Sequence, residues 1–146
     1  LRMGWIASKS EEVLHQCLER RDYDTISCGM IDDMLASLAL ANKEKIFERN
    51  RAILKKNRQI LDDWVNSTPQ VHYLRPVAGT TALVYYDLDM PSYGLCKRLT
   101  KEKGLLFTPG AAFEMEGAVR IGYAFDSKLL KEGLDKFTEF LEEESK

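Results

Sequence analysis

A regular alternation of bulky and small residues near the C-terminal end predicts a β-strand around Arg120. The bulky set is Val119, Ile121, Tyr123 and Phe125, and the alternate set is Arg120, Gly122 and Ala124. Successive side chains of a strand point to opposite faces, so one face is apolar and the other holds one guanidinium between small residues. Such an arginine can bind a carboxylate through two parallel hydrogen bonds. The pattern also fits an arginine at a sheet edge that meets solvent or a nearby acid, so both interpretations stay open.

The first seven residues show the same alternation. In Leu1–Ala7, one side holds Arg2, Gly4 and Ile6, and the other holds Met3 and Trp5. We therefore expect a strand at the beginning of the chain as well. Two strands of the form Arg-x-Gly would then bracket the sequence.

Apolar residues at helical spacing predict five helices. Their expected ranges are Glu11–Arg20, Ser27–Ala41, Lys43–Val65, Ser92–Lys103 and a last helix from Ser127, which carries Leu129, Leu130, Leu134, Phe137 and Leu141 on one side. Ser8 is expected to cap the first helix, since Glu11 three residues later completes a capping box. Ser92 is expected to cap the fourth helix and Gly104 to end it. The polar run Arg20–Asp24 is expected to be a connection.

The longest of these helices has one apolar stripe. Its apolar pairs recur every seven residues and are Ile46/Phe47, Ile53/Leu54 and Ile60/Leu61, with Trp64 continuing the stripe. This side should face a core. The other side is basic, but no aromatic residues alternate with its lysines and arginines, so a solvated helix face explains it better than a nucleic-acid surface.

Stretches rich in β-branched and aromatic residues predict the remaining strands. We expect them at Val71–Pro76, Thr80–Leu88 and Leu105–Thr108, with Thr80–Leu88 in the centre of the sheet. From Val71 onward the order is strand, strand, helix, strand, strand, helix. This order predicts an α/β fold in which helices cover a mostly antiparallel sheet.

Composition and charge narrow the classes of partner. The 146 residues carry a formal net charge of -2, which gives no overall attraction to nucleic acid or to an anionic membrane. No apolar run approaches the roughly 20 residues that a membrane-spanning helix needs. The three cysteines, at positions 17, 28 and 96, have no zinc-binding spacing and are typical of reduced thiols in a cytoplasmic protein. The two histidines lie far apart, so no metal site is expected.

Several motifs, taken together and in order, resemble the C-terminal part of a class I/II aminotransferase. They are Leu-Arg-Met-Gly-Trp-Ile-Ala at the start, the helix end Asn57–Val65, the turn Pro76-x-x-Gly79, Pro109-Gly110-x-x-Phe113, and Val-Arg-Ile-Gly-Tyr-Ala from Val119. These enzymes use pyridoxal 5'-phosphate (PLP) and share the fold type of aspartate aminotransferase. The resemblance covers nearly the whole chain.

The resemblance implies a domain organisation and two binding residues. Residues 1–24 would be a remnant of the large PLP-binding domain, residues 25–66 a helical segment with a long interdomain helix, and residues 67–146 the small C-terminal α/β domain. Arg2 matches the family arginine that binds the cofactor phosphate, and Arg120 matches the one that binds the substrate α-carboxylate. Gly110 and Phe113 match a segment near the substrate entrance and are expected to shape it.

The resemblance also implies that the catalytic lysine is absent from this chain. The family's Schiff-base lysine should lie roughly eight residues before the phosphate-binding arginine, which places it ahead of Leu1. Lys9 lies on the other side of Arg2 and has no supporting residues, so it cannot replace that lysine. The chain begins without Met, and we expect a fragment that is inactive alone and does not retain PLP. The parent enzyme is expected to be a homodimer acting on an amino acid and a 2-oxo acid.

Two alternatives remain open. A PLP-dependent carbon-sulfur lyase, acting by β-elimination, would share the fold, the cofactor and the arginine. A noncatalytic interaction domain would instead use the long helix or an exposed sheet edge for oligomerisation. The resemblance also implies that the other strands of the large domain are absent from this chain, so we expect the strand Leu1–Ala7 to be disordered or to pair with another copy of the chain.

Overall fold

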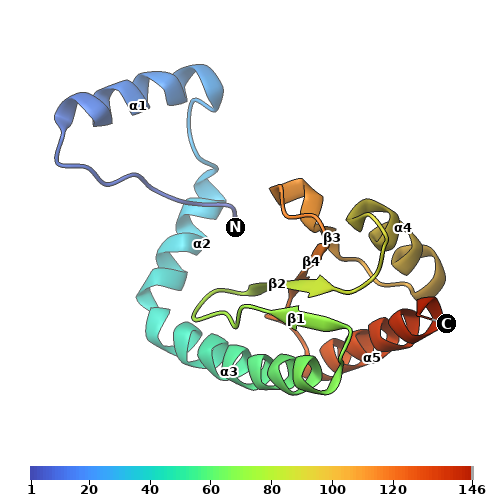
Figure 1. Ribbon diagram of the computed structural model, residues 1–146. Coiled ribbons are helices and arrows are strands. Elements are labelled where there is room, and N and C mark those ends of the chain that lie inside the picture. Colours follow the sequence, from blue (N-terminus) through green and yellow to red (C-terminus); the bar gives the residue numbers. More distant parts are fainter. Residues whose placement is uncertain (146) are drawn as a thin grey trace. The chain divides into compact units, whose positions relative to one another are not determined.

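The computed structural model describes residues 1–145 (Figure 1). Its elements, in chain order, are α1 (Glu11–Asp24), α2 (Met30–Ala41), α3 (Lys43–Ser67), β1 (Val71–Tyr73), β2 (Thr81–Tyr86), α4 (Ser92–Lys103), β3 (Thr108–Pro109), the 3-10 helix η1 (Gly110–Phe113), β4 (Ala118–Gly122) and α5 (Ser127–Glu144). The chain forms two compact units, Leu1–Glu48 and Arg49–Lys146, and the boundary between them lies within α3.

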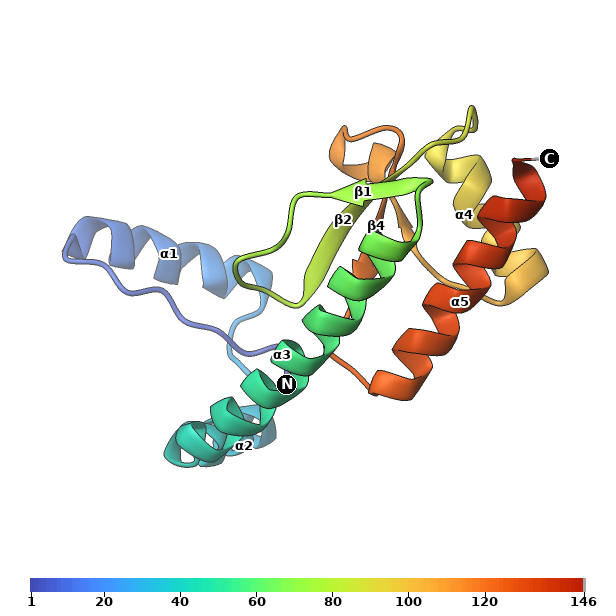
Figure 2. The ribbon, with the colours of Figure 1, turned by 60° about the horizontal axis from the view of Figure 1, so that its bottom comes forward.

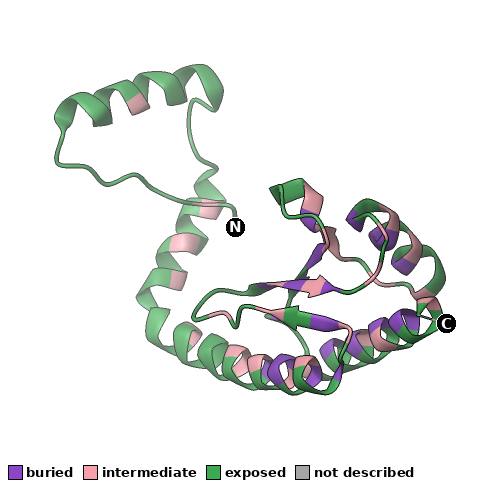
Figure 3. Cartoon of the chain, in the orientation of Figure 1, coloured by how far each residue is buried: buried purple, intermediate pink, exposed green. Residues whose placement is uncertain are grey.

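The N-terminal unit contains helices but no strand among its described residues. Leu1–Ala7 is irregular, so the strand expected there is wrong for this structure. A strand needs a neighbour to pair its backbone groups, and none is formed here. Neither α1 nor α2 has a buried residue, and Figure 3 shows both helices as mostly exposed.

The cap of α1 differs from the expected one. Ser10, not Ser8, is the N-cap, and its Oγ accepts a hydrogen bond of 3.3 Å from the backbone N of Val13. Ser8 Oγ instead accepts one of 3.1 Å from the backbone N of Ser10. The helix also continues through the run Arg20–Asp24, which was expected to be a connection. Ser8 and Ser10 are only two residues apart and either can serve as a cap, so the local sequence does not decide between them.

The C-terminal unit is built on a four-stranded antiparallel sheet with the order β1-β2-β4-β3. This confirms the predicted α/β class and the central place of the strand within Thr80–Leu88. β1 is shorter than the expected Val71–Pro76, because only Val71–Tyr73 pairs with a neighbour. The strand expected at Leu105–Thr108 is wrong except at Thr108, because residues 105–107 do not pair with a neighbour and β3 is Thr108–Pro109. Figure 2 shows α3 and α5 running beside the strands.

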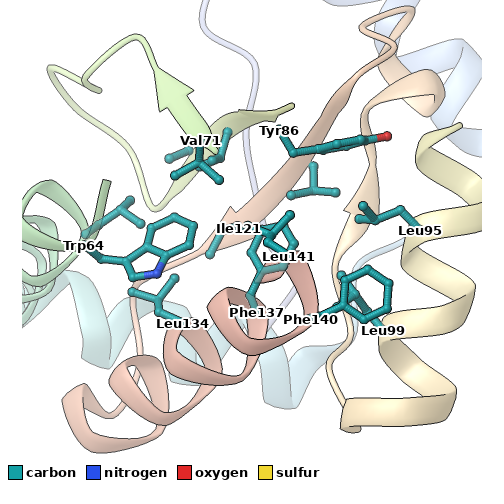
Figure 4. Close-up of a cluster of buried hydrophobic side chains, with 14 of the residues drawn as sticks. Trp64, Val71, Tyr86, Leu95, Leu99, Ile121, Leu134, Phe137, Phe140 and Leu141 are labelled. Atoms are coloured by element: carbon teal, nitrogen blue, oxygen red, sulfur yellow. The ribbon is translucent and has the colours of Figure 1, made fainter. Parts of the chain in front are cut away.

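One apolar core joins the sheet to its helices (Figure 4). Alternate residues of the two central strands point into it, and they include Ala82, Val84, Tyr86, Val119 and Ile121. The helices contribute Leu61 and Trp64 of α3, Leu95 and Leu99 of α4, and Leu130, Leu134, Phe137, Phe140 and Leu141 of α5. The apolar side predicted for α5 is confirmed except at Leu129, which is 59% exposed. Adjacent helical residues differ by about 100° around the axis, so Leu129 and Leu130 cannot both face the core.

Helix α4 begins and ends at the expected residues, but its cap is different. Gly104 ends it with a φ of 69°, a left-handed conformation that glycine adopts without steric cost. The N-cap is Pro91, whereas Ser92 is the first helical residue and is fully buried. The Ser92 hydroxyl does not cap its own helix and instead accepts a hydrogen bond from the backbone N of Ala111.

Candidate functional site

Arg120 lies in β4 on the sheet face opposite to the core. Its neighbours Val119 and Ile121 are buried, while Arg120 itself is exposed, as the predicted alternation requires. In the sheet it stands between Leu83 of β2 and Thr108 of β3. The strand ends at Gly122, so Phe125 does not continue the apolar face and is 46% exposed.

Two side chains from the preceding segment orient the guanidinium of Arg120. Its Nη2 donates a hydrogen bond of 3.1 Å to the hydroxyl of Thr108. The ring of Phe113 lies against the guanidinium, with 4.9 Å between Cζ and the ring centroid, which is a cation–π contact. Among residues 1–145, no acidic group forms an ion pair with Arg120. Its charge is thus not neutralised by a side chain of the described chain.

Phe113 is presented by η1, and Gly110 allows η1 to pack closely on β4. A Cβ atom at Gly110 would lie 2.0 Å from the carbonyl oxygen of Met115 and 2.6 Å from that of Ala118. Both are backbone atoms, so they cannot move aside as a flexible side chain could. The backbone N of Met115 also donates a hydrogen bond of 3.0 Å to the carbonyl oxygen of Gly110. The glycine expected to shape this segment is therefore sterically required.

The segment around η1 is also attached to α4. The backbone N of Ala111 donates a hydrogen bond of 3.1 Å to Ser92 Oγ, and the backbone N of Ser92 donates one of 2.5 Å to Glu116 Oε1. Glu116 also accepts from the backbone N of Gly117 at 3.2 Å. These hydrogen bonds, that from Ser92 first, lower the pKa of Glu116 below its usual value. A charged carboxylate at the first turn of α4 also complements the helix dipole.

Arg2 lies in the irregular segment at the start of the N-terminal unit. Its backbone has a φ of 58°, and the residue is exposed. No hydrogen bond or ion pair within residues 1–145 engages its guanidinium. Arg2 and Arg120 belong to different units, and each stands as a separate candidate.

The histidine, cysteine and acidic residues within residues 1–145 form no metal site, and the cysteines are separate free thiols. No group of three or more His, Cys, Asp or Glu residues within the described chain could hold a metal ion. Cys17, Cys28 and Cys96 are free thiols, and Cys96 is buried in the core. Burial raises the pKa of the Cys96 thiol to about 11, which keeps it in the unreactive thiol form.

Two buried polar residues on α3 were missed by the sequence patterns. Asn57 is completely buried, and its side chain bonds to groups near the end of β4 and the start of α5. Its position between Leu54 and Leu61, on the apolar stripe of the helix, could have indicated a buried hydrogen bond, because a buried amide needs a partner. The sequence pattern does not identify the residues to which Asn57 is hydrogen-bonded.

The second of these residues is Asp62, which binds residues of β1 and the segment after it. Arg75 Nε donates to both carboxylate oxygens at 2.9 Å, and Nη2 donates to Oδ2 at 2.8 Å. The hydroxyl of Tyr73 donates to Oδ1. The hydrogen bonds from Arg75, more than any other cause, lower the pKa of Asp62, while burial raises the pKa of the Tyr73 hydroxyl. The cluster attaches β1 and the segment after it to α3.

Comparison with known proteins agrees with this fold. The family model described as aminotransferase class I and II matches residues 1–137. A PLP-dependent aminotransferase from Streptococcus suis has a solved structure that is 41% identical, with a TM-score of 0.88 over 93% of this chain and 36% of that chain. No helix in the described part of the chain has both the length and the apolar character to cross a membrane.

Two curated relatives come from Arabidopsis thaliana. The probable aminotransferase TAT1 is 25% identical over 95% of this chain and 34% of its own length. The S-alkyl-thiohydroximate lyase SUR1 is 23% identical over 95% of this chain and 33% of its own length. The chain thus spans about a third of the length of these relatives. Because the family model matches nearly all of it and the α/β fold agrees, the chain belongs to the class I and II aminotransferases.

Proposed function

We propose that this chain is part of a PLP-dependent aminotransferase in which Arg120 binds the α-carboxylate of an amino acid or a 2-oxo acid. This role is supported most by two properties of its guanidinium, which are its fixed orientation and its lack of an acidic partner within residues 1–145. Thr108 and Phe113 orient it, and no acid of residues 1–145 neutralises it. A surface arginine with only a structural role would gain most from an acidic partner, which Arg120 does not have here.

The geometry accounts for how such a site would work. A carboxylate accepts two parallel hydrogen bonds from one edge of a guanidinium, and this fixes its orientation as well as its position. The guanidinium carbon of Arg120 lies over the Phe113 ring, and the Thr108 hydroxyl accepts a hydrogen bond from Nη2. A guanidinium that is already oriented loses less conformational freedom when the substrate binds. The substrate therefore binds more tightly than it would to a mobile arginine.

For the cofactor, Arg2 is the residue of this chain that we assign. Its exposed guanidinium, unpaired within residues 1–145, fits a phosphate group, which arginine binds through charge-assisted hydrogen bonds. PLP, when bound, supplies the electron sink that makes amino-group transfer possible. The lysine that would anchor it lies ahead of Leu1 in our proposal. The 146 residues alone would then neither retain PLP nor catalyse transfer.

The domain assignment is part of the same proposal. Residues 1–24 would belong to the large domain, residues 25–66 to the connecting helices, and residues 67–146 to the small domain. The irregular state of Leu1–Ala7, in which every residue except the half-buried Met3 is exposed, supports this, because such a segment would gain its neighbours from the rest of the parent protein. We also propose a homodimeric parent enzyme in the cytoplasm.

A carbon-sulfur lyase is the second candidate, and the Arabidopsis lyase among the relatives favours it. The two reactions give different products from the same kind of site. Formation of pyruvate, ammonia and a thiol from a sulfur-containing amino acid would identify β-elimination. Formation of a new amino acid from an added 2-oxo acid would identify transfer.

A noncatalytic interaction domain is the third candidate. Helix α2 presents large apolar residues to solvent, among them Met30 at 85%, Ile31 at 71% and Met34 at 56% exposure. Such a surface can serve association between chains. This candidate predicts partner binding on which added PLP has no effect.

The deciding experiment uses the protein expressed from its complete reading frame. PLP is added first and an L-amino acid mixture second, while the visible absorption spectrum is followed. We expect a bound-cofactor band that converts to the pyridoxamine form when the amino acids are added. Absence of any cofactor band would reject the enzyme assignment and leave the interaction domain.

Arg120→Ala tests the site within that experiment. Loss of a bidentate carboxylate contact should weaken transition-state binding by about 2–4 kcal/mol, which lowers kcat/KM roughly 30-fold to 1000-fold. Arg120→Lys should recover only part of it, since an ammonium cannot donate two parallel hydrogen bonds. Arg49→Ala, at an exposed arginine of α3, is the matched control. Unchanged turnover in Arg120→Ala would reject the assignment of this residue.

A further inference from the structure

We propose that Ser92, the first residue of α4, is a positioning residue for the carboxylate site at Arg120. It touches neither Arg120 nor the space beside it, and it acts through the segment that carries Phe113. The inference rests on the proposed role of Arg120 as the carboxylate-binding residue. Three contacts within the C-terminal unit carry it.

The first contact attaches Ser92 to η1. The backbone N of Ala111 donates to Ser92 Oγ at 3.1 Å, and Ala111 is two residues before Phe113. Because Ala111 and Phe113 belong to the same turn of 3-10 helix, fixing the backbone at Ala111 restricts the direction of the Phe113 side chain. Ser92 therefore limits where the Phe113 ring can lie.

The second contact attaches Ser92 to the other end of the same segment. Its backbone N donates to Glu116 Oε1 at 2.5 Å, and Glu116 stands two residues before the first residue of β4. Ser92 thus bonds to both ends of the segment 111–116, once through its hydroxyl and once through its backbone. The ordinarily low pKa of a carboxyl, lowered further here, keeps Glu116 charged at neutral pH.

The third contact is the result of the first two. The Phe113 ring, at the tip of the segment so held, lies 4.9 Å from Cζ of Arg120. Phe113 is 44% exposed, so little core packing holds the ring in place. Its position depends on the backbone beneath it, which Gly110 joins to β4 and Ser92 joins to α4.

Ser92 suits this place because it is small, completely buried and able to accept a hydrogen bond. Alanine would keep the size but leave the backbone N of Ala111 without its acceptor. Gly110 would still pack on β4, so η1 would loosen rather than unfold. The Phe113 ring would then no longer restrain the guanidinium, and ordering Arg120 would have to occur when the carboxylate binds.

The first test observes Arg120 itself, by NMR of the 146-residue chain. An aromatic ring shifts the resonances of protons held against its face, so the Nε–H signal of Arg120 reports on Phe113. The signal is assigned by its absence in Arg120→Lys. Phe113→Leu should move it, and Ser92→Ala should move it in the same direction. A signal that keeps its wild-type position in Ser92→Ala overturns the proposal.

Ser127→Ala is the matched control for this test. Ser127 is the first residue of α5, and its hydroxyl also makes a hydrogen bond to another segment, donating to Asn57 Oδ1 at 2.6 Å. Its loss should lower stability without moving the Arg120 signal. A shift of equal size in Ser127→Ala would mean that general destabilisation, not positioning, explains the effect, and it would also overturn the proposal.

The second test measures amino-acid binding and turnover in the enzyme from the complete reading frame. Ser92→Ala should weaken the amino-acid Kd about threefold to tenfold, with kcat at saturation unchanged. The double variant Ser92→Ala/Phe113→Leu should bind no more weakly than Phe113→Leu alone, because both changes remove one restraint. Additive losses would overturn the proposal.

A second variant covers the case in which Ser92→Ala does not fold. Glu116→Gln changes an exposed residue, keeps one oxygen as an acceptor for the backbone N of Ser92, removes the charge and replaces the other oxygen with an amide nitrogen. It should shift the Arg120 signal and the Kd in the same direction by less. A Glu116→Gln enzyme with wild-type signal and Kd would then overturn the proposal. If Arg120→Ala leaves the Kd unchanged, the proposed function fails, whereas the NMR result still decides the role of Ser92.

Discussion

The side-chain Nδ2 of Asn57 donates a hydrogen bond of 2.8 Å to the carbonyl oxygen of Tyr123, a residue 66 positions further along the chain. The same nitrogen donates to the carbonyl oxygen of Phe125 at 2.7 Å, and Oδ1 accepts from the hydroxyl of Ser127. One buried amide thus connects α3 to the segment between β4 and α5. This segment follows directly on the strand that carries Arg120.

Asn57→Ala should lower the free energy of unfolding by about 2–4 kcal/mol. Two backbone carbonyls would lose their donor inside the protein, and an unpaired buried polar group is costly. Urea denaturation of the 146-residue chain measures the change. Asn66→Ala, an exposed asparagine of the same helix, should stay within about 0.5 kcal/mol of the wild type. Equal effects of the two substitutions would contradict the role of Asn57.

Asp62 should make stability depend on pH in the acid range. Its pKa is lower in the folded protein than in the unfolded chain, chiefly because of the hydrogen bonds from Arg75. Its contribution to stability is therefore fully present above the unfolded pKa of about 4 and is lost as the pH falls through the lower folded pKa. The stability difference between wild type and Asp62→Asn should be largest at neutral pH and should shrink below about pH 4.

Urea denaturation at several pH values measures this dependence. Asp63→Asn, an exposed neighbour in α3, is the matched control and should keep the wild-type profile between neutral and acid pH. A constant difference between wild type and Asp62→Asn at all pH values would show that the carboxylate charge has no part in the stability. The amide would then differ from the acid only in its packing.

Gly110→Ala and Gly133→Ala should act in opposite directions. At Gly110 the new Cβ would overlap two backbone carbonyl oxygens, so η1 must move away from β4, at a cost of about 1–3 kcal/mol or more. At Gly133, within α5, the nearest atom would be Leu105 Cδ2 at 3.6 Å, an ordinary contact. Alanine there should stabilise the helix by about 0.5–1 kcal/mol. Thermal denaturation of both variants is the measurement, and a destabilised Gly133→Ala or a neutral Gly110→Ala would contradict it.

The thiols should differ sharply in reactivity. Cys28 is exposed, whereas Cys96 is buried and its pKa is raised to about 11. Alkylation at about pH 8, followed by mass spectrometry, should label Cys28 first and Cys96 only when urea unfolds the chain. The variant Cys28→Ser should lose the fast phase of labelling. Rapid labelling of Cys96 in the native protein would mean that the core around α4 opens readily.

Much of the architecture could be predicted because it follows from local patterns. The alternation around Arg120 placed its guanidinium on the face away from the core, and the helical spacing of α5 identified its buried side. The pattern was ambiguous where two neighbours compete for one role. Ser8 and Ser10 could both cap α1, and Leu129 and Leu130 could both face inward, so the choice depends on packing that the local sequence does not contain.

The sequence by itself therefore determined the α/β class, the central strands, the ends of α4 and the face on which Arg120 lies, because periodicity and glycine conformation act over a few residues. Only the tertiary structure decided the partners of Asn57, Asp62, Ser92 and Phe113. Their contacts join segments that are distant or irregular in the chain. A hydrogen bond of this kind forms only after packing has brought its two segments within about 3 Å of each other, and no local periodicity records that approach.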